Sequence, residues 1–450
     1  MTAFLQFLIA LFFIVTLLLI IFERTHKTLA AMLGAGLCLF LAIQPGTGKN
    51  GEALIPDVEH LVEFLEVDLL LVIIGITLMV GVARTTGIFD YIAIVIFKKG
   101  GNNQYKLLVA LSFLTLLFSA FLDAYLAILL ISSITLVGCS ALDINPKPFI
   151  LAEAIFGNLG GTMTRIASPP NLILGGHFDV NFVVFFILTA PFVLISAIVT
   201  LVIWSYLFKN EFSKGVDESK YLEVMLINEG SVITDRKDFY LTGIILLLTV
   251  LGFVIASFLP FSIELGYIAM TGGFLMVGLV GKNVEHALEK VEWPLVFFLI
   301  GLLTIVGIGE KAGILEFLAA PIEIIFENNI LGGLIFIQWL NAIVSSILDN
   351  IPVASVMTSI MDILLENYPN LDFYPLLASV VIGTNLGGNI TPIGSASSVQ
   401  AVTILNKSEG DMDMRVTFIE FIRVGGIVTL AHLLIGTIYI FILWIIGGII

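Results

Sequence analysis

The sequence predicts an all-α polytopic membrane protein made of two inverted repeats. Each repeat contributes five spans, one re-entrant hairpin and a helix broken at the midplane. Of the 450 residues, 58% are hydrophobic and 12% are charged, about half the charged share of a soluble domain. Apolar runs of about 18 residues or more recur along the chain, which favours spanning helices over a β-barrel. Glycine and polar residues also recur at one spacing in both halves.

Composition and charge exclude several other classes of protein. The net charge is −15, which argues against a nucleic-acid partner. Cys38 and Cys139 lie in apolar stretches and lack the spacing of a zinc or redox site, so we interpret both as buried thiols. No cofactor is predicted, and the lipid bilayer is the main partner.

Twelve apolar segments are candidate spans. The first, from Phe4 to Phe22, has no preceding basic residues and no small-residue cleavage site, so we interpret it as a retained span. The others cover roughly 28–43, 67–83, 106–137, 148–176, 181–208, 238–258, 263–280, 293–309, 331–366, 373–405 and 417–449.

Two of these segments are too long for one crossing. Segments 106–137 and 331–366 each carry an Asp near the middle. Each is expected to be a hairpin that enters and leaves on one side, since non-helical backbone is tolerated at membrane depth where protein or a water-filled cavity surrounds it. The long segments 148–176 and 373–405 are expected to be broken helices.

The distribution of Lys and Arg predicts the orientation. With the N-terminus outside and both hairpins re-entrant, 17 of the 20 basic residues, Lys27 among them, fall on the inner side. Both termini then lie outside the cytoplasmic membrane. The hydrophilic stretch 209–237 is a cytoplasmic linker between a first repeat at 1–208 and a second at 238–450.

The two halves match residue by residue. Asp123 and Asp349 lie 226 residues apart, and the stretch from Asn158 to Ser168 matches that from Asn385 to Ser395 at a spacing of 227. The same 226-residue spacing relates Gly75, Gly81 and Gly87 to Gly301, Gly307 and Gly313. With five crossings in each half, the second half is inverted, which is the plan of secondary transporters with a site near the midplane.

Asp123 and Asp349 are the first candidate site residues. A charge at the centre of an apolar span costs about 2.5 to 3.5 kcal/mol on insertion scales, so something must offset it. The carboxylates either bind a cation or proton, or cap the second hairpin helix, and both interpretations can hold. Asn350 and Pro352 follow Asp349, whereas Ala124 follows Asp123, so the two tips are expected to differ.

The broken helices supply the other candidates. Paired glycines at 160–161 and 387–388, together with prolines, prevent a continuous helix and expose carbonyl groups and helix ends. We expect a sodium ion, where one binds, at Asp349, Asn350 and Asn389. The side chains expected to add ligands are Asn158, Thr162, Thr164, Ser168, Asn171, Asn385, Asn389, Thr391, Ser395 and Ser397.

Arg165 has no counterpart, because Pro392 occupies the equivalent position. It either binds an anionic substrate or neutralises Asp123, Glu153 or Asp349. Glu153 is accordingly either a coupling group or the partner of Arg165.

At these residues the sequence resembles the ion transporter superfamily. The branch it resembles contains arsenite-efflux permeases, NhaD-type sodium/proton antiporters, citrate-transporter-like permeases and the melanocyte P protein. The motifs are Leu122-Asp123, Leu348 to Pro352, Gly160 to Asn171, and Asn385 to Ala396. The resemblance implies binding at the hairpin tips and the broken-helix loops, a scaffold domain that forms a homodimer, and a transport domain that moves like an elevator. Ala124, Arg165 and Ala167 depart from the usual pattern.

These observations predict a secondary active transporter, not an enzyme, driven by a Na⁺ or H⁺ gradient. Efflux of an arsenite-like oxyacid or Na⁺/H⁺ exchange is preferred, because paired Asp residues repel an unneutralised polyanion. Cation-coupled uptake of a di- or tricarboxylate, or another anion, is the alternative that Arg165 supports. A passive channel is the alternative of another class.

Overall fold

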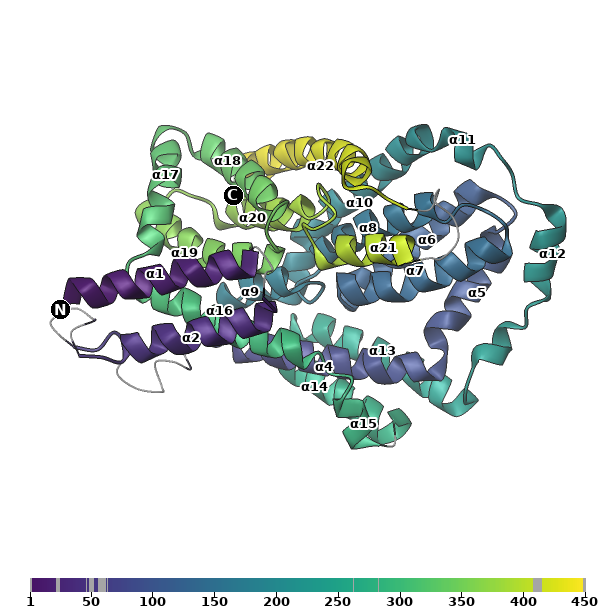
Figure 1. Ribbon diagram of the computed structural model, residues 1–450, viewed down its shortest axis with the longest axis horizontal. Coiled ribbons are helices and arrows are strands. Elements are labelled where there is room, and N and C mark those ends of the chain that lie inside the picture. The colour runs from purple at the N-terminus through teal and green to yellow at the C-terminus, as the bar shows by residue number, and fades with distance from the viewer. Residues whose placement is uncertain are drawn as a thin grey trace.

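The computed structural model describes residues 2–21, 25–45, 47, 52–55, 62, 64–261, 263–281, 283–407 and 415–447. The described elements are helices joined mostly by short connections (Figure 1). Among the described residues, seven helices are long and apolar enough to cross a membrane, and five shorter apolar helices accompany them. The prediction of an all-α polytopic membrane protein is confirmed.

The helices follow the predicted spans closely, and segment 67–83 is reproduced without change. The first half comprises α1 (Thr2–Ile21), α2 (Lys27–Ala42), α4 (Val67–Ala83), η2 (Arg84–Thr86), α5 (Ile88–Gly100), α6 (Gln104–Phe121), α7 (Ala124–Ala141), α8 (Lys147–Met163), α9 (Pro169–His177) and α10 (Phe182–Leu207). The predicted linker carries α11 (Lys209–Phe212), α12 (Glu218–Leu226) and η3 (Glu229–Val232). The second half comprises α13 (Arg236–Ala256), α14 (Leu265–Met276), η4 (Val277–Gly281), α15 (Val284–Leu288), α16 (Trp293–Lys311), α17 (Leu315–Asn328), α18 (Ile330–Ser345), α19 (Asn350–Asn367), α20 (Phe373–Gly387), α21 (Ala396–Lys407) and α22 (Phe418–Gly447).

Helices α5 and α17 lie outside the predicted spans. They start one or two residues after Gly87 and Gly313, which have φ angles of 79° and 74° and are 226 residues apart. Glycine adopts this left-handed conformation without a steric cost. Charged residues in α5 and Pro321 in α17 shorten the apolar runs, so neither helix gave a span-length signal.

The long segments divide where the sequence predicted. Helices α6 and α7 are joined at Leu122-Asp123, and α18 and α19 are joined by residues 346–349. The α6–α7 pair extends to the right in Figure 1 and α18–α19 to the left, so their tips approach each other near the centre. Helices α8 and α20 stop at Met163 and Gly387, and α9 and α21 resume after each break. Inversion of the halves across the bilayer stays a prediction.

The repeat is also visible in hydrogen bonds. Ser119 Oγ donates to the carbonyl oxygen of Gly157 over 2.5 Å, and Ser345 Oγ donates to that of Thr384 over 2.6 Å. Both bonds attach the first helix of a hairpin to the following broken helix, α6 to α8 and α18 to α20. Each half therefore builds the same hairpin-and-broken-helix unit.

Buried hydrophobic side chains form two large clusters. One is built mainly from α6–α8, α10 and α18–α22. The other is built mainly from α1, α2, α4, α13, α14 and α16. Most buried side chains of the hairpins and broken helices thus share one core with α10 and α22, and most of those in the other spans share the second.

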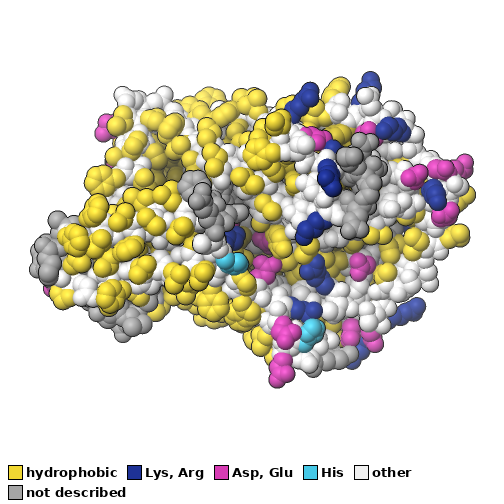
Figure 2. Space-filling model, in the orientation of Figure 1, with side chains coloured by type: hydrophobic (Ala, Val, Ile, Leu, Met, Phe, Trp, Pro, Cys, Tyr) yellow, Lys and Arg dark blue, Asp and Glu magenta, His cyan; other side chains and the backbone are white. Residues whose placement is uncertain are grey.

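The surface separates apolar and charged regions. On the face shown in Figure 2, hydrophobic side chains cover the part that contains α1 and α2, and most Lys and Arg side chains gather toward the other end, where α12 lies. The linker is held at that end by Lys98 of α5, which pairs with Glu229 of η3. The Lys98 ammonium lowers the pKa of the Glu229 carboxyl by donating a hydrogen bond to it.

Candidate functional site

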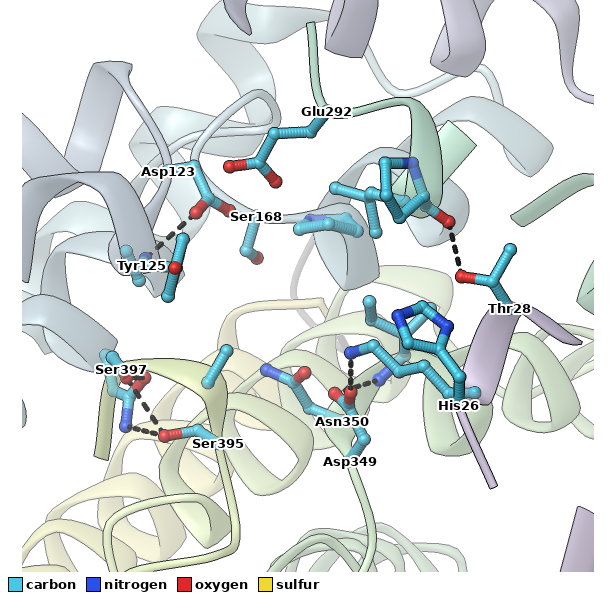
Figure 3. A pocket seen from close by; sticks show the side chains of 18 residues that line it. His26, Thr28, Asp123, Tyr125, Ser168, Glu292, Asp349, Asn350, Ser395 and Ser397 are labelled. Atoms are coloured by element: carbon cyan, nitrogen blue, oxygen red, sulfur yellow. Dashed lines mark hydrogen bonds and ion pairs between the residues drawn. The ribbon is translucent and has the colours of Figure 1, made fainter. Parts of the chain in front are cut away.

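A polar pocket of about 310 Å³ lies where the two hairpin tips, the two broken helices and the starts of α2 and α16 meet. Figure 3 shows Asp123 and Asp349 on opposite walls, with Ser168 near Asp123 and Ser395 in the lower part of the view, to the left of Asp349. The pocket is therefore lined by helix ends and loops from both repeats.

Asp123 caps the second helix of its hairpin and lines the pocket. Its carboxylate accepts hydrogen bonds from the backbone N–H groups of Tyr125, at 2.9 Å, and Leu126, at 3.4 Å. Its φ angle of 108° is unusual for a residue with a side chain. Glu292, the residue before α16, extends toward Asp123 across the pocket (Figure 3).

Asp349 has the same capping role but a different neighbour. Its Oδ1 accepts from the backbone N–H of Ile351 at 3.4 Å, and its Oδ2 lies 2.8 Å from the ammonium of Lys27. Lys27 is the first residue of α2, and its ammonium also lies 5.2 Å from the ring centre of Phe298 in α16. The predicted difference between the two tips is thus present, and a built-in cation contacts the second tip.

The two breaks are bonded to each other. Asn158 Nδ2 donates to Ser395 Oγ over 2.9 Å, and Ser168 Oγ donates to Asn385 Oδ1 over 3.1 Å. These bonds join equivalent positions of the two repeats in reciprocal fashion. In addition, Ser397 Oγ donates to Asn158 Oδ1 over 2.6 Å. Hydrogen bonds consequently join the two broken helices to each other where they line the pocket.

The predicted site residues divide into two groups. Those that line the pocket are Asp123, Asn158, Ser168, Asp349, Asn350, Ser395 and Ser397. Those that lie behind it are Thr162, Thr164, Asn171, Asn385, Asn389 and Thr391.

Residues behind the pocket mostly fix its shape. Thr164 Oγ1 donates to the carbonyl oxygen of Ala120, and Thr391 Oγ1 donates to that of Ser346, so each break is tied to its hairpin tip. Asn389 Oδ1 accepts from Asn158 Nδ2, whereas Asn389 Nδ2 has no partner among the described residues.

The candidate partners of Arg165 were wrong. Its guanidinium lies 3.4 Å from Asp68 at the start of α4 and donates to the carbonyl oxygen of Val180 over 3.1 Å. Asp68 lies near the start of the predicted span 67–83, and nothing in the local sequence links it to the break. Arg165 is nearly fully buried and does not line the central pocket.

Glu153 is not the partner of Arg165 either. It is fully buried between α7 and α8, where Ser132 Oγ donates to it over 2.7 Å and Thr135 Oγ1 over 2.5 Å. The structure therefore surrounds this carboxyl with hydroxyl groups, and the coupling role stays a prediction.

Several pocket residues were missed by sequence reasoning. These are His26, Lys27, Thr28, Tyr125 and Glu292. Glu292 lies 226 residues after Glu66, and each precedes a repeat-related helix, so the repeat contained a signal for it. Lys27 was assigned to the inner side by charge, but its ammonium reaches the pocket. Among the described residues no group of His, Cys, Asp and Glu forms a candidate metal cluster.

Hairpin tips and broken helices that meet at a polar pocket, inside an all-α membrane fold, define this chain as a membrane transporter. The chain belongs to the family described as citrate transporter, whose model matches residues 17–369.

Similar proteins match the chain over nearly its whole length. A 46 kDa membrane protein of Mycobacterium leprae is 30% identical over 429 residues, covering 95% of this chain and 96% of the relative. The human P protein is 25% identical, covering 96% of this chain and 59% of its own length. The YdaH transporter of Alcanivorax borkumensis matches in fold with a TM-score of 0.59 and 14% identity, over 94% of this chain and 99% of that one.

Proposed function

We propose that the protein is a secondary active transporter that moves a small ion across the cytoplasmic membrane, coupled to a Na⁺ or H⁺ gradient. The observation that carries the proposal is the charge of the central pocket. Among the described residues its lining contains three carboxylates, Asp123, Glu292 and Asp349, and one ammonium, that of Lys27. Such a pocket favours cations, because carboxylates are hard oxygen ligands and can also carry protons.

The Lys27–Asp349 pair supports a cation position at the second tip. The ammonium occupies the place where a free cation would contact the Asp349 carboxylate. A Na⁺ ion or a proton that bound there would compete with Lys27. Because Lys27 belongs to α2 and Asp349 to the α18–α19 hairpin, this competition would weaken a contact between those two elements. In the proposed elevator motion, cation binding would thus release the hairpin unit from the scaffold.

The preferred cargo is the small ion itself, by Na⁺/H⁺ exchange or efflux of an arsenite-like oxyacid. Three carboxylates against one ammonium repel a polyanion unless cations accompany it. A second candidate is cation-coupled uptake of a di- or tricarboxylate. The description of the family and the presence of Lys27 in the pocket favour that candidate.

Reconstitution into liposomes tests the proposal. We expect uphill flux of one labelled substrate from a panel of arsenite, Na⁺, citrate and succinate when a Na⁺ or H⁺ gradient is imposed. Asp349→Ala should abolish this flux, and Asp90→Asn, an exposed carboxylate of α5, serves as the matched control. Flux that only ever runs downhill would instead identify a passive channel.

Lys27→Met is the second variant. Removal of the competing ammonium should lower the cation concentration needed for half-maximal transport by about tenfold, as expected for the loss of roughly 1.4 kcal/mol of competition. An unchanged cation dependence would remove Lys27 from the coupling mechanism.

A further inference from the structure

A second cavity, of about 250 Å³, adjoins the central pocket and has a different charge. It lies between the end of α4, the start of α7 and the segment before α16. Tyr125 and Glu292 line both cavities. Arg84 and Lys290 line the second cavity only, so we refer to it as the basic cavity.

The two basic side chains have no ion-pair partner within the described part of the chain. Both are half-buried. The remaining wall is partly apolar, with Val80, Leu126 and Leu129. Charges beside an apolar wall attract counter-ions more strongly than charges in open water. Two cations face one carboxylate, Glu292, which lies at the boundary with the central pocket.

The position of Lys290 depends on a glycine. A Cβ atom at Gly81 would lie 2.6 Å from the Cβ of Lys290, closer than two such atoms can approach. The absence of a side chain at Gly81 thus lets the stem of Lys290 cross α4 and reach the cavity. The same contact exists in the other repeat, where a Cβ at Gly307 would lie 2.3 Å from the ring of Phe64.

Comparison with the repeat shows that the two basic residues of this cavity have no basic counterparts at the equivalent positions. Positions 226 residues from Arg84, Lys290 and Glu292 hold Glu310, Phe64 and Glu66. The equivalent positions of the other repeat therefore carry two carboxylates and no cation. At the glycine contact that both repeats share, Lys290 thus stands in one repeat and Phe64 in the other, where the Lys311 ammonium lies 5.0 Å from the Phe64 ring centre.

We propose that the basic cavity is an anion-binding vestibule, which takes up a small carboxylate or oxyanion next to the central pocket. It lies at the end of α4 beside the linker, since Thr234 Oγ1, close after η3, donates to the carbonyl oxygen of Thr85 over 2.9 Å. Glu292 then separates an anion at Arg84 and Lys290 from the cation position at the hairpin tips. That this anion is cargo rests on the proposed transport function, whereas its binding does not.

A cysteine in the cavity wall tests the charge preference without knowledge of the ligand. The measured quantity is the rate at which Leu129→Cys reacts with a sulfonate-bearing methanethiosulfonate reagent, divided by its rate with an ammonium-bearing one. We expect this rate ratio to fall when Arg84→Gln and Lys290→Gln are added. The expected change in the rate ratio is about tenfold, the lower end for electrostatic enrichment in a cleft. The unsubstituted chain is the blank, since Cys38 and Cys139 are buried.

The matched control removes two exposed charges elsewhere, with Lys99→Gln and Lys106→Gln. It should leave the rate ratio unchanged. An equal change in the control, or no change in the Arg84/Lys290 variant, would overturn the vestibule. Should Leu129→Cys fail to fold, the melting temperature of the chain without that cysteine is measured with and without citrate. We expect citrate to raise it in the native chain and in the Lys99/Lys106 control, but not in the Arg84/Lys290 variant.

Two further arms identify the source of the anion. The ratio of the rates for the anionic and cationic reagents should be the same in nanodiscs of phosphatidylcholine and in nanodiscs that contain phosphatidylglycerol. Loss of the preference for the anionic reagent in phosphatidylglycerol would assign the cavity to a lipid headgroup and overturn uptake of a free anion. In liposomes, a normal rate ratio together with no gradient-driven flux would contradict the proposed function alone, whereas normal flux with an absent charge preference would contradict the vestibule alone.

Discussion

At the scale of single residues, the hairpin aspartates combine two roles that the sequence left open. Asp123 and Asp349 each accept a backbone N–H bond at the start of a helix and each line the pocket. The sequence located both because a carboxylate within an apolar run is costly. It could not locate Lys27, because a basic residue between two spans usually marks a loop on the inner side.

Substitution of the aspartates separates capping from charge. Asp123→Asn keeps an acceptor for the backbone N–H groups, so it should fold with an unchanged melting temperature. Asp349→Asn also keeps the acceptor but loses the charge that pairs with Lys27, so it should lose up to about 1 kcal/mol of stability. The Ala variants should each lose about 1 kcal/mol of stability through loss of the cap. Transport should vanish in Asp349→Ala and change its ion dependence in Asp123→Ala. Full activity of Asp349→Ala in liposomes would remove that residue from the site.

The partner of Arg165 in the structure is Asp68, whereas the sequence offered Asp123, Glu153 or Asp349, and this changes the expected effect of substituting Arg165. With 5% of its surface exposed and Asp68 as its partner, Arg165→Gln should destabilise the protein by about 3 kcal/mol, because an uncompensated carboxylate is left half-buried. Asp68→Asn as a second change should recover part of the loss in thermal unfolding. Glu153→Gln should recover none, and recovery by that variant would contradict the assigned pair.

At the scale of elements, the breaks and hairpins were predictable because they depend on local chemistry. Glycine pairs and prolines interrupt a helix regardless of its surroundings. The reciprocal bonds between Asn158, Ser168, Asn385 and Ser395 were not predictable, since they join residues more than 200 positions apart. A repeat shows that two motifs are equivalent, but it does not show that they contact each other.

Close packing of each broken helix against its hairpin predicts the effect of a methyl group. A Cβ at Gly160 would lie 2.3 Å from the carbonyl oxygen of Leu116, and one at Gly387 would lie 2.4 Å from that of Ala342. Gly160→Ala and Gly387→Ala should each destabilise by about 1 to 3 kcal/mol, since backbone must shift. Gly426→Ala in α22 is the control, because nothing lies within 4 Å of its added Cβ. Melting temperatures that fall equally in all three variants would contradict this explanation.

At the scale of the whole molecule, the repeat organises two cores around one pocket. Symmetry accounts for the matching hairpins, the matching breaks and the two left-handed glycines before α5 and α17. The proposed coupling and the proposed vestibule both depend on where the symmetry fails. Lys27 contacts only one tip, and Arg84 and Lys290 lie on only one side. Such differences are visible in the sequence as unmatched charges, but their positions follow only from the packing of α2, α4 and α16 around the hairpins.

The orientation of the whole chain is testable through its two ends in Figure 1, where α17 and the linker lie far apart. Asn328 at the end of α17 and Ser213 after α11 are both exposed. Because basic residues concentrate on the cytoplasmic side, Asn328→Cys should react with an impermeant thiol reagent in intact cells. Ser213→Cys should react only after permeabilisation, with the native chain and its two buried cysteines as the blank. The opposite pattern would reverse the orientation, and reaction of both in intact cells would contradict the separation of these two segments by the bilayer.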